Sequence, residues 1–99
     1  MAHGPALMDT EKFRQALVHR VYHLAADRVV ALHKHPRHDE VFYCVKGAGY
    51  GVLESAEVPL TPGQAFIVPA GVMHALRTEG DLYVTSTLVP LADDPQFSL

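Results

Sequence analysis

Short apolar runs separated by turn residues are the feature of this 99-residue chain that most limits its possible folds. From Leu17 onward such runs recur at intervals of roughly ten residues. We expect β-strands over residues 18–24, 28–35, 41–46, 50–54, 65–68, 72–78 and 82–89. Ahead of them, Asp9 or Thr10 is a suitable N-cap for a short helix over residues 11–15. Many short strands and almost no helix predict an all-β fold, an antiparallel sandwich or small barrel.

Glycine and proline mark the turns between these runs. Gly47-Ala48-Gly49 predicts a tight turn, because glycine adopts positive φ without a steric penalty. Pro59 and Pro62 argue against regular strand pairing over residues 58–63. No repeat, linker or low-complexity segment divides the chain. We therefore expect a single domain over residues 1–99, with a barrel core over about residues 17–90 and a disordered leader over residues 1–8.

Composition excludes several classes of protein. A formal net charge of −3 gives no electrostatic reason to expect nucleic acid or an anionic membrane as a partner. Cys44 is the only cysteine, so an intrachain disulfide and a cysteine-rich zinc site are both excluded. The first residues lack a basic and apolar leader, and no apolar run is long enough to span a bilayer. A cytoplasmic location is the expectation.

Two histidines separated by one residue, His33 and His35, carry the first sign of chemistry. A β-strand points residues i and i+2 to the same face, so both imidazoles can reach one ion. In a helix the same two side chains would point about 200° apart. The apolar residues before His33 and the position of Pro36 after His35 favour a strand. The pair therefore predicts a metal site on a strand.

The surrounding residues form two motifs. The chain reads His33-x-His35-x4-Glu40-x6-Gly47 and then Gly63-x5-Pro69-x-Gly71-x2-His74. The first resembles the first conserved motif of the cupins, and the second resembles their second motif. Both occur in the family's order and with every internal spacing respected, over residues 33–74. Two positions at the motif edges depart from the family pattern: Asp27 replaces the usual glycine and Thr78 the usual asparagine.

The resemblance implies a conical jelly-roll barrel that holds a metal inside, bound by His33, His35, Glu40 and His74. Imidazole and carboxylate ligands without thiolate suit Fe(II), Mn(II), Ni(II), Zn(II) or Cu(II), and ligand type alone does not select one. Four protein ligands leave about two positions open in an octahedral ion. Substrate, water or dioxygen can bind there, unlike at a closed structural zinc site. We expect one divalent transition metal.

Three other histidines and one aspartate are alternative candidates for ligands. His38 and Asp39 lie beside Glu40, and either becomes a candidate ligand if the strand register differs by a residue or more, but a solvated turn is the favoured interpretation. His19 and His23 have the spacing of a helical zinc pair, yet Arg20 stands where a metalloprotease motif needs glutamate. Residues of a sheet surface are the favoured interpretation for both.

The wall of a cavity can also be anticipated. Phe42 and Cys44 share strand parity with Glu40 and should point into the barrel with it. Cys44 is then a core residue or a soft group near the metal, and core packing is favoured. The remaining candidates for the lining are Tyr50, Leu76, Tyr83, Thr85 and Thr87.

Two classes of function remain open. One is a mononuclear metal enzyme acting on a small molecule, either an Fe(II)- or Mn(II)-dependent dioxygenase or an isomerase or lyase with a Lewis-acid ion. The other is a barrel that binds or senses a metal or small ligand without turnover. Because sheet edges are usually paired or covered, we also expect a homodimer formed across the N-terminal strand over residues 17–24, as similar small cupins form.

Overall fold

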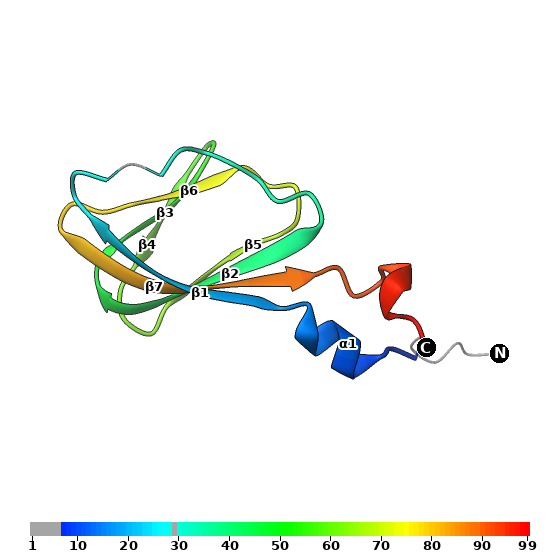
Figure 1. The fold of residues 1–99 in the computed structure, drawn as a ribbon. Helices are drawn as coiled ribbons and strands as arrows, with labels where there is room; N and C mark the ends of the chain where they lie inside the picture. Colours follow the sequence, from blue (N-terminus) through cyan, green and yellow to red (C-terminus); the bar gives the residue numbers. More distant parts are fainter. Residues whose placement is uncertain (1–6, 29) are drawn as a thin grey trace.

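The computed structural model describes residues 7–28 and 30–99, which form two antiparallel sheets that face each other (Figure 1). The four-stranded sheet has the order β1-β7-β2-β5, with β1 at Val18–Ala25, β7 at Asp81–Pro90, β2 at His38–Gly47 and β5 at Ala65–Val68. The three-stranded sheet has the order β4-β3-β6, with β4 at Glu57–Leu60, β3 at Gly49–Leu53 and β6 at His74–Arg77. The predicted all-β, jelly-roll architecture is confirmed.

The core lies between the two sheets. On β2 the side chains of Glu40, Phe42 and Cys44 are buried, whereas Tyr43 and Val45, which have the opposite parity, are exposed. This period of two follows from the pleat of a strand. The buried apolar cluster consists of Leu24, Phe42, Cys44, Leu60, Phe66, Val68, Leu76, Leu82 and Val84. Burial of each large member stabilises the fold by about 1.5–3 kcal/mol before entropy is counted.

A short helical pair lies beyond the barrel, at the far ends of β1 and β7 (Figure 1). Helix α1, Thr10–Gln15, is capped by Asp9, whose side chain accepts a hydrogen bond from the Lys12 N–H at 3.0 Å. The predicted N-terminal helix is thereby confirmed. Its Phe13 ring meets Phe97 of the 3₁₀ helix η1, Pro95–Phe97, at 5.1 Å between ring centres.

A disordered leader was expected over residues 1–8, and its first six residues lie outside the described part of the chain. Leu7 and Met8 are described, and both pair with the end of the chain. Met8 forms an isolated bridge with Ser98, and the Leu99 N–H donates to the Leu7 carbonyl at 3.2 Å.

The predicted strand over residues 28–35 is wrong. The described residues of this run, 28 and 30–35, form a loop whose one β contact is a bridge between His33 and His74. The described apolar residues before His33, Val30, Ala31 and Leu32, lie in no strand, and Leu32 is exposed. β-propensity reflects packing against neighbours more than backbone preference, so the sequence signal was overridden. The prediction that His33 and His35 lie on a strand is therefore wrong as well, although both side chains still reach one cluster of potential ligands.

The expectation about residues 58–63 also needs correction, because β4 forms and contains Pro59. Pro59 pairs with Tyr50 of β3, and β4 is an edge strand of its sheet. Proline lacks an N–H, and at a sheet edge the missing donor can face away from the neighbouring strand.

The turn at Gly47-Ala48-Gly49 is confirmed between β2 and β3. Gly47 has φ +81°, and a Cβ there would lie 2.0 Å from the Asp81 carbonyl oxygen. Any larger residue would collide with β7, so this position requires glycine.

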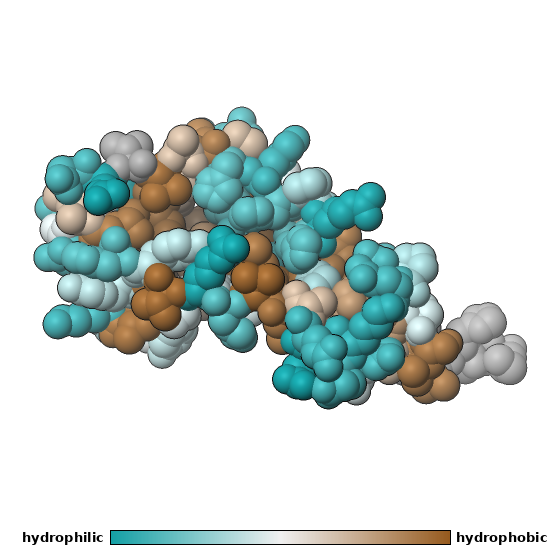
Figure 2. All heavy atoms as spheres, viewed as in Figure 1, coloured by the Kyte–Doolittle hydropathy of each residue, from teal (hydrophilic) through white to brown (hydrophobic). Residues whose placement is uncertain are grey.

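Exposed apolar side chains remain on the outer face of the four-stranded sheet. Val21 of β1 is 75% exposed and Ile67 of β5 is 65% exposed. Figure 2 shows hydrophobic residues (brown) reaching the surface at several places on the side that carries β1 and α1. In the described part of the chain no helix has the length and hydropathy needed to cross a membrane.

Candidate metal centre

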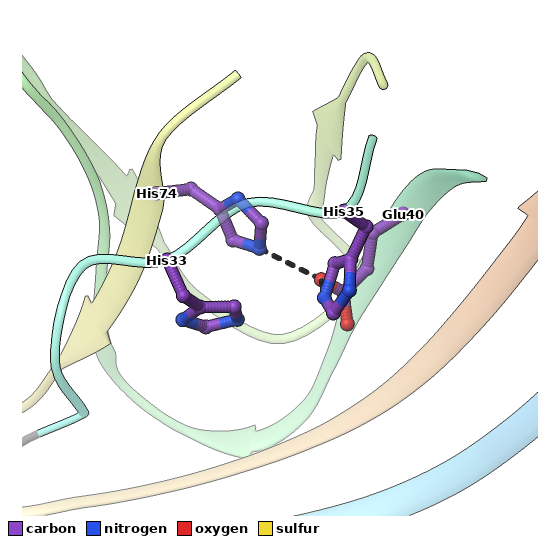
Figure 3. A group of neighbouring side chains, drawn as sticks. All are labelled: His33, His35, Glu40 and His74. Carbon is purple, nitrogen blue, oxygen red and sulfur yellow. Dashed lines mark hydrogen bonds and ion pairs between the residues drawn. The ribbon is translucent and has the colours of Figure 1, made fainter. Parts of the chain in front are cut away.

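Four side chains from three parts of the chain point toward one another inside the barrel (Figure 3). His33 and His35 come from the loop before β2, Glu40 from β2, and His74 from the start of β6. One potential ligand atom from each lies within 4.8 Å of all the others. His74 is 1% exposed and Glu40 4%, whereas His33 and His35 are half-buried. The structure thus brings together all four residues that the motifs indicated.

A network of backbone hydrogen bonds holds the two motifs against each other. The bridge between His33 and His74 is closed by two hydrogen bonds of 2.8 and 2.9 Å. The Gly71 N–H donates to the His35 carbonyl at 2.9 Å, and Gly71 has φ +84°, which favours glycine. The Ala70 N–H donates to the Asp39 carboxylate at 2.8 Å. Asp39 therefore ties the turn before His74 to the strand that carries Glu40.

Two of the imidazoles have their orientation fixed by the backbone. Nδ1 of His33 lies 2.9 Å from the Ala31 carbonyl oxygen, and Nδ1 of His74 lies 2.9 Å from that of Val72. A carbonyl oxygen only accepts, so each Nδ1 carries the hydrogen. In the neutral ring the lone pair is then on Nε2, the form in which imidazole binds metals.

The distances at the centre match a shared ion. Nε2 of His74 lies 2.8 Å from Oε1 of Glu40, and Nε2 of His35 lies 3.1 Å from the same oxygen. Bonds of about 2.1 Å in octahedral geometry separate adjacent ligand atoms by about 3.0 Å. One divalent cation between these atoms would satisfy the nitrogen lone pairs and the carboxylate together. The donor set therefore fits a transition metal with nitrogen and oxygen ligands.

Ser86 of β7 completes the surroundings of Glu40. Its hydroxyl is buried and donates to Oε2 of Glu40 at 2.6 Å, which leaves Oε1 facing the imidazoles. Sequence reasoning did not identify Ser86. The usable signal was the alternation along β7, where Leu82, Val84 and Ser86 share the buried face.

A cavity of about 250 Å³ opens beside this centre. Its lining consists of Val18, Arg20, Tyr22, Leu24, Val30, His33, His35, Glu40, Phe42, Leu76, Ser86 and Leu88. The candidates Phe42 and Leu76 lie in this wall. Sequence reasoning missed the contribution of β1, whose alternate residues from Val18 to Leu24 face the cavity. His74 does not border the open space, consistent with its almost complete burial.

The structure places the other lining candidates elsewhere. Cys44 lies in the hydrophobic core, where burial raises the pKa of its thiol. Tyr50 and Tyr83 border a separate pocket between the β2–β3 and β6–β7 turns. Thr85 and Thr87 have the opposite strand parity to the inward-facing Ser86 and lie on the outer side of β7.

The alternative ligands have other partners. Asp39 binds the Ala70 N–H, and His38 lies at the start of β2 opposite Pro90. On the outer side of β1, Nε2 of His23 lies 2.7 Å from Asp81 while its ring stacks on Tyr83. His19 lies beside Thr87. Among the described residues, these four histidine and aspartate side chains are not part of the central cluster.

The fold and this site define a cupin, and comparison with known proteins agrees. The model of the cupin domain family matches residues 20–89, so the chain belongs to that family. Quercetin 2,3-dioxygenase of Bacillus subtilis is 35% identical over 72 residues. That match covers 72% of this chain but only 21% of the relative, so the chain spans about a fifth of the curated protein it matches.

Solved structures extend the similarity. KdgF from a Halomonas species is 33% identical, with a TM-score of 0.67 over 94% of this chain and 76% of that one. An RmlC-like cupin from Shewanella frigidimarina is 26% identical, with a TM-score of 0.68 over 79% of this chain and 69% of that one. The family resemblance inferred from the two motifs is confirmed.

Proposed function

We propose that this cupin is a metal-dependent enzyme that acts on a small molecule, with one divalent transition metal held by His33, His35, Glu40 and His74. The observation that carries the proposal is the convergence of four ligand atoms within 4.8 Å, with the Nδ1 atoms of His33 and His74 already engaged by backbone carbonyls. Preset ring orientation is what a metal-binding histidine requires.

The protein's own residues divide the work of such a site. The three imidazoles and Glu40 hold the ion, and Ser86 fixes the carboxylate. Apolar side chains, among them Phe42 and Leu76, keep water from most of the cavity wall. When bound, Fe(II) or Mn(II) supplies open coordination positions for substrate and dioxygen. A volume of about 250 Å³ suits a ligand smaller than a typical drug molecule.

A dioxygenase is the reaction class we favour. Apart from the proposed ligands, the described lining residues include three groups with exchangeable protons: Arg20, Tyr22 and Ser86. Of these, Tyr22 is the one left as a candidate acid or base. Isomerases and lyases need a positioned acid or base, whereas oxygen chemistry relies chiefly on the metal. The similarity to a quercetin 2,3-dioxygenase supports the same choice.

The same scarcity of acid and base groups supports a second candidate, a barrel that binds a metal and a small ligand without turnover. The two candidates differ in whether ligand and dioxygen are consumed. Oxygen uptake by the Fe(II)-loaded protein, measured with a panel of phenols, diketones and thiols, separates them. Consumption of oxygen with one compound supports the enzyme, and ligand affinity without consumption supports the binder.

Metal content tests the site itself. Protein purified without a nickel column and supplied with Fe(II) or Mn(II) should contain about one ion per chain by elemental analysis. His74→Ala should lose the ion while keeping its far-ultraviolet circular dichroism. Because His74 is buried, His35→Ala at a half-buried position provides a second variant that is less demanding on the fold.

His19→Ala, on the outer side of β1, is the matched control and should retain the ion. Absence of metal from the wild-type protein after both additions contradicts the proposal. Equal metal content in folded His35→Ala and His19→Ala proteins contradicts the assigned ligands.

A further inference from the structure

One charged side chain in the cavity wall has no part in the proposed metal centre. Arg20 lies on β1 and borders the cavity together with Tyr22, and both side chains are also exposed to solvent. The Arg20 backbone pairs with that of Ser86 on β7, and the Ser86 hydroxyl donates to Glu40. Facing residues on adjacent strands have Cβ atoms about 5 Å apart. Only β7 therefore separates Arg20 on β1 from the Glu40 carboxylate on β2.

The guanidinium of Arg20 has most of its donors uncommitted within the described part of the chain. Its one hydrogen bond there runs from an NH group to the Tyr22 hydroxyl at 3.4 Å, a long and weak contact. Guanidinium carries five N–H donors and stays charged at any physiological pH. Arg20 and Tyr22 therefore present a fork of donors beside a hydroxyl at the cavity wall.

The charge balance of the cavity favours an anion. Among the described residues that line it, Arg20 is the only arginine or lysine and Glu40 the only acid. A divalent ion at the proposed centre outweighs the single charge of Glu40, so this step rests on the proposed function. Arg20 adds a second positive charge to a wall that is otherwise largely apolar.

We propose that Arg20 binds the carboxylate of a small organic acid whose apolar body fills the cavity between β1 and the metal centre. A planar carboxylate accepts two parallel hydrogen bonds from guanidinium, which fixes orientation as well as charge. A phosphate monoester, with a charge of about −2, needs more donors than one guanidinium and one phenol supply. Arg20 is thus a positioning residue for substrate, and it selects monocarboxylates over neutral analogues of the same shape.

Benzoate and its neutral amide, benzamide, are suitable probes because they differ chiefly in charge. We expect the wild-type protein to bind benzoate about tenfold or more tightly than benzamide, as measured by calorimetry or ligand-observed NMR. Arg20→Gln should abolish that preference while leaving benzamide binding unchanged. Arg20→Lys should retain part of the benzoate preference, because lysine keeps the positive charge but cannot donate two parallel hydrogen bonds. Arg14→Gln, an exposed position on α1, controls for net charge and should match the wild type.

Metal content, measured on the same samples, separates this inference from the proposed function. Arg20→Gln should keep its ion, whereas His74→Ala should not. If EDTA abolishes the benzoate preference and Arg20→Gln does not, the carboxylate binds the metal, and the inference about Arg20 is wrong while the metal site stands. If no variant binds metal, the proposed function fails, and the Arg20-dependent preference in the metal-free protein still decides the inference. Wild-type protein without a benzoate preference also overturns it.

Discussion

At the scale of single residues, Ser86 shows how much of this site depends on groups outside the four proposed ligands. The carboxylate of Glu40 is buried, and its Oε2 accepts one short hydrogen bond from the Ser86 hydroxyl. A carboxylate that is free to rotate presents either oxygen to the imidazoles. With Ser86 in place, Oε1 is the oxygen that faces His35 and His74.

Replacing Ser86 by alanine should therefore weaken metal binding without removing a ligand. Loss of an outer-shell partner of a metal ligand typically costs 10- to 100-fold in affinity, and we expect about tenfold for Ser86→Ala. Competition with a chromogenic chelator measures the change. Thr85→Ala, the neighbouring residue on the outer side of β7, is the matched control and should bind metal as the wild type does. Equal weakening in both variants would show that the strand, not the hydroxyl, is responsible.

Gly71 offers a test of backbone geometry at the same site. It has φ +84°, and a Cβ placed on it meets nothing within 4 Å, so substitution costs conformational strain alone. Gly71→Ala should destabilise the fold by about 1 kcal/mol and lower Tm by roughly 4–8 °C. Gly80→Ala also meets nothing within 4 Å but has no positive φ. Its Tm, measured by the same thermal scan, should stay near that of the wild type, and an equal loss in both would refute the strain argument.

The four central residues could be predicted because they occupy fixed positions in two sequence motifs. Ser86 and Arg20 could not, since their roles follow from cross-strand register. Ser86 lies beside Glu40 only because β7 pairs with β2, and Arg20 faces Ser86 only because β1 pairs with β7. A sequence shows which residues share a face of one strand, but not which strand lies next to it.

At the scale of elements, one arginine links the three strands of the smaller sheet on its outer face. Arg77 of β6 stacks over the Tyr50 ring of β3 at 4.0 Å and binds Glu57 of β4 through two hydrogen bonds of 2.5 and 2.7 Å. The side chain therefore crosses all three strands. A bidentate pair holds a fixed geometry better than a single contact between flexible side chains.

This pair predicts a pH dependence of stability. The hydrogen bonds from Arg77 lower the pKa of Glu57 below its ordinary value. A carboxyl whose pKa falls on folding stabilises the fold above its unfolded pKa, and that contribution is lost as pH falls through the folded value. Glu57→Gln should therefore have a slightly lower Tm than the wild type at pH 7, and the gap should close in strongly acidic buffer.

Glu79→Gln is the control for that experiment, because Glu79 reaches Arg77 only through one contact of 3.4 Å. It should leave Tm nearly unchanged at both pH values. A gap between the wild type and Glu57→Gln that persists undiminished in acid would show that the Arg77 pair does not cause it.

Elements were predicted well where each strand has neighbours on both sides or a clear turn beside it. The predicted strand 65–68 coincides with β5, and 41–46 lies within β2. The prediction failed for residues 28–35, where the described apolar residues pair with no strand, and for β4, where Pro59 is tolerated because the strand lies at an edge. Both errors concern pairing, which local sequence does not encode.

At the scale of the whole molecule, the chain is elongated, with dimensions of 53 × 26 × 21 Å. The long strands β1 and β7 continue past the barrel to α1 and η1 (Figure 1). β1 is an edge strand, and its outer side carries Val21, which is 75% exposed. Native proteins often cover or pair an exposed sheet edge.

We therefore expect a homodimer formed across β1, in which the exposed Val21 would be buried between two copies. Light scattering at micromolar concentration should give about twice the 10.8 kDa mass of the chain. Val21→Lys should shift the protein toward the monomer, because burial of an unpaired charge in an interface is costly. Ile67→Lys makes the same change on β5, at the opposite edge of the same sheet, and should leave the dimer intact. A dimer broken by Ile67→Lys and not by Val21→Lys would place the contact on β5. Because Arg20 lies beside Val21 on β1 and faces the cavity, a contact across β1 would also hold the strand that carries the proposed carboxylate-binding residue.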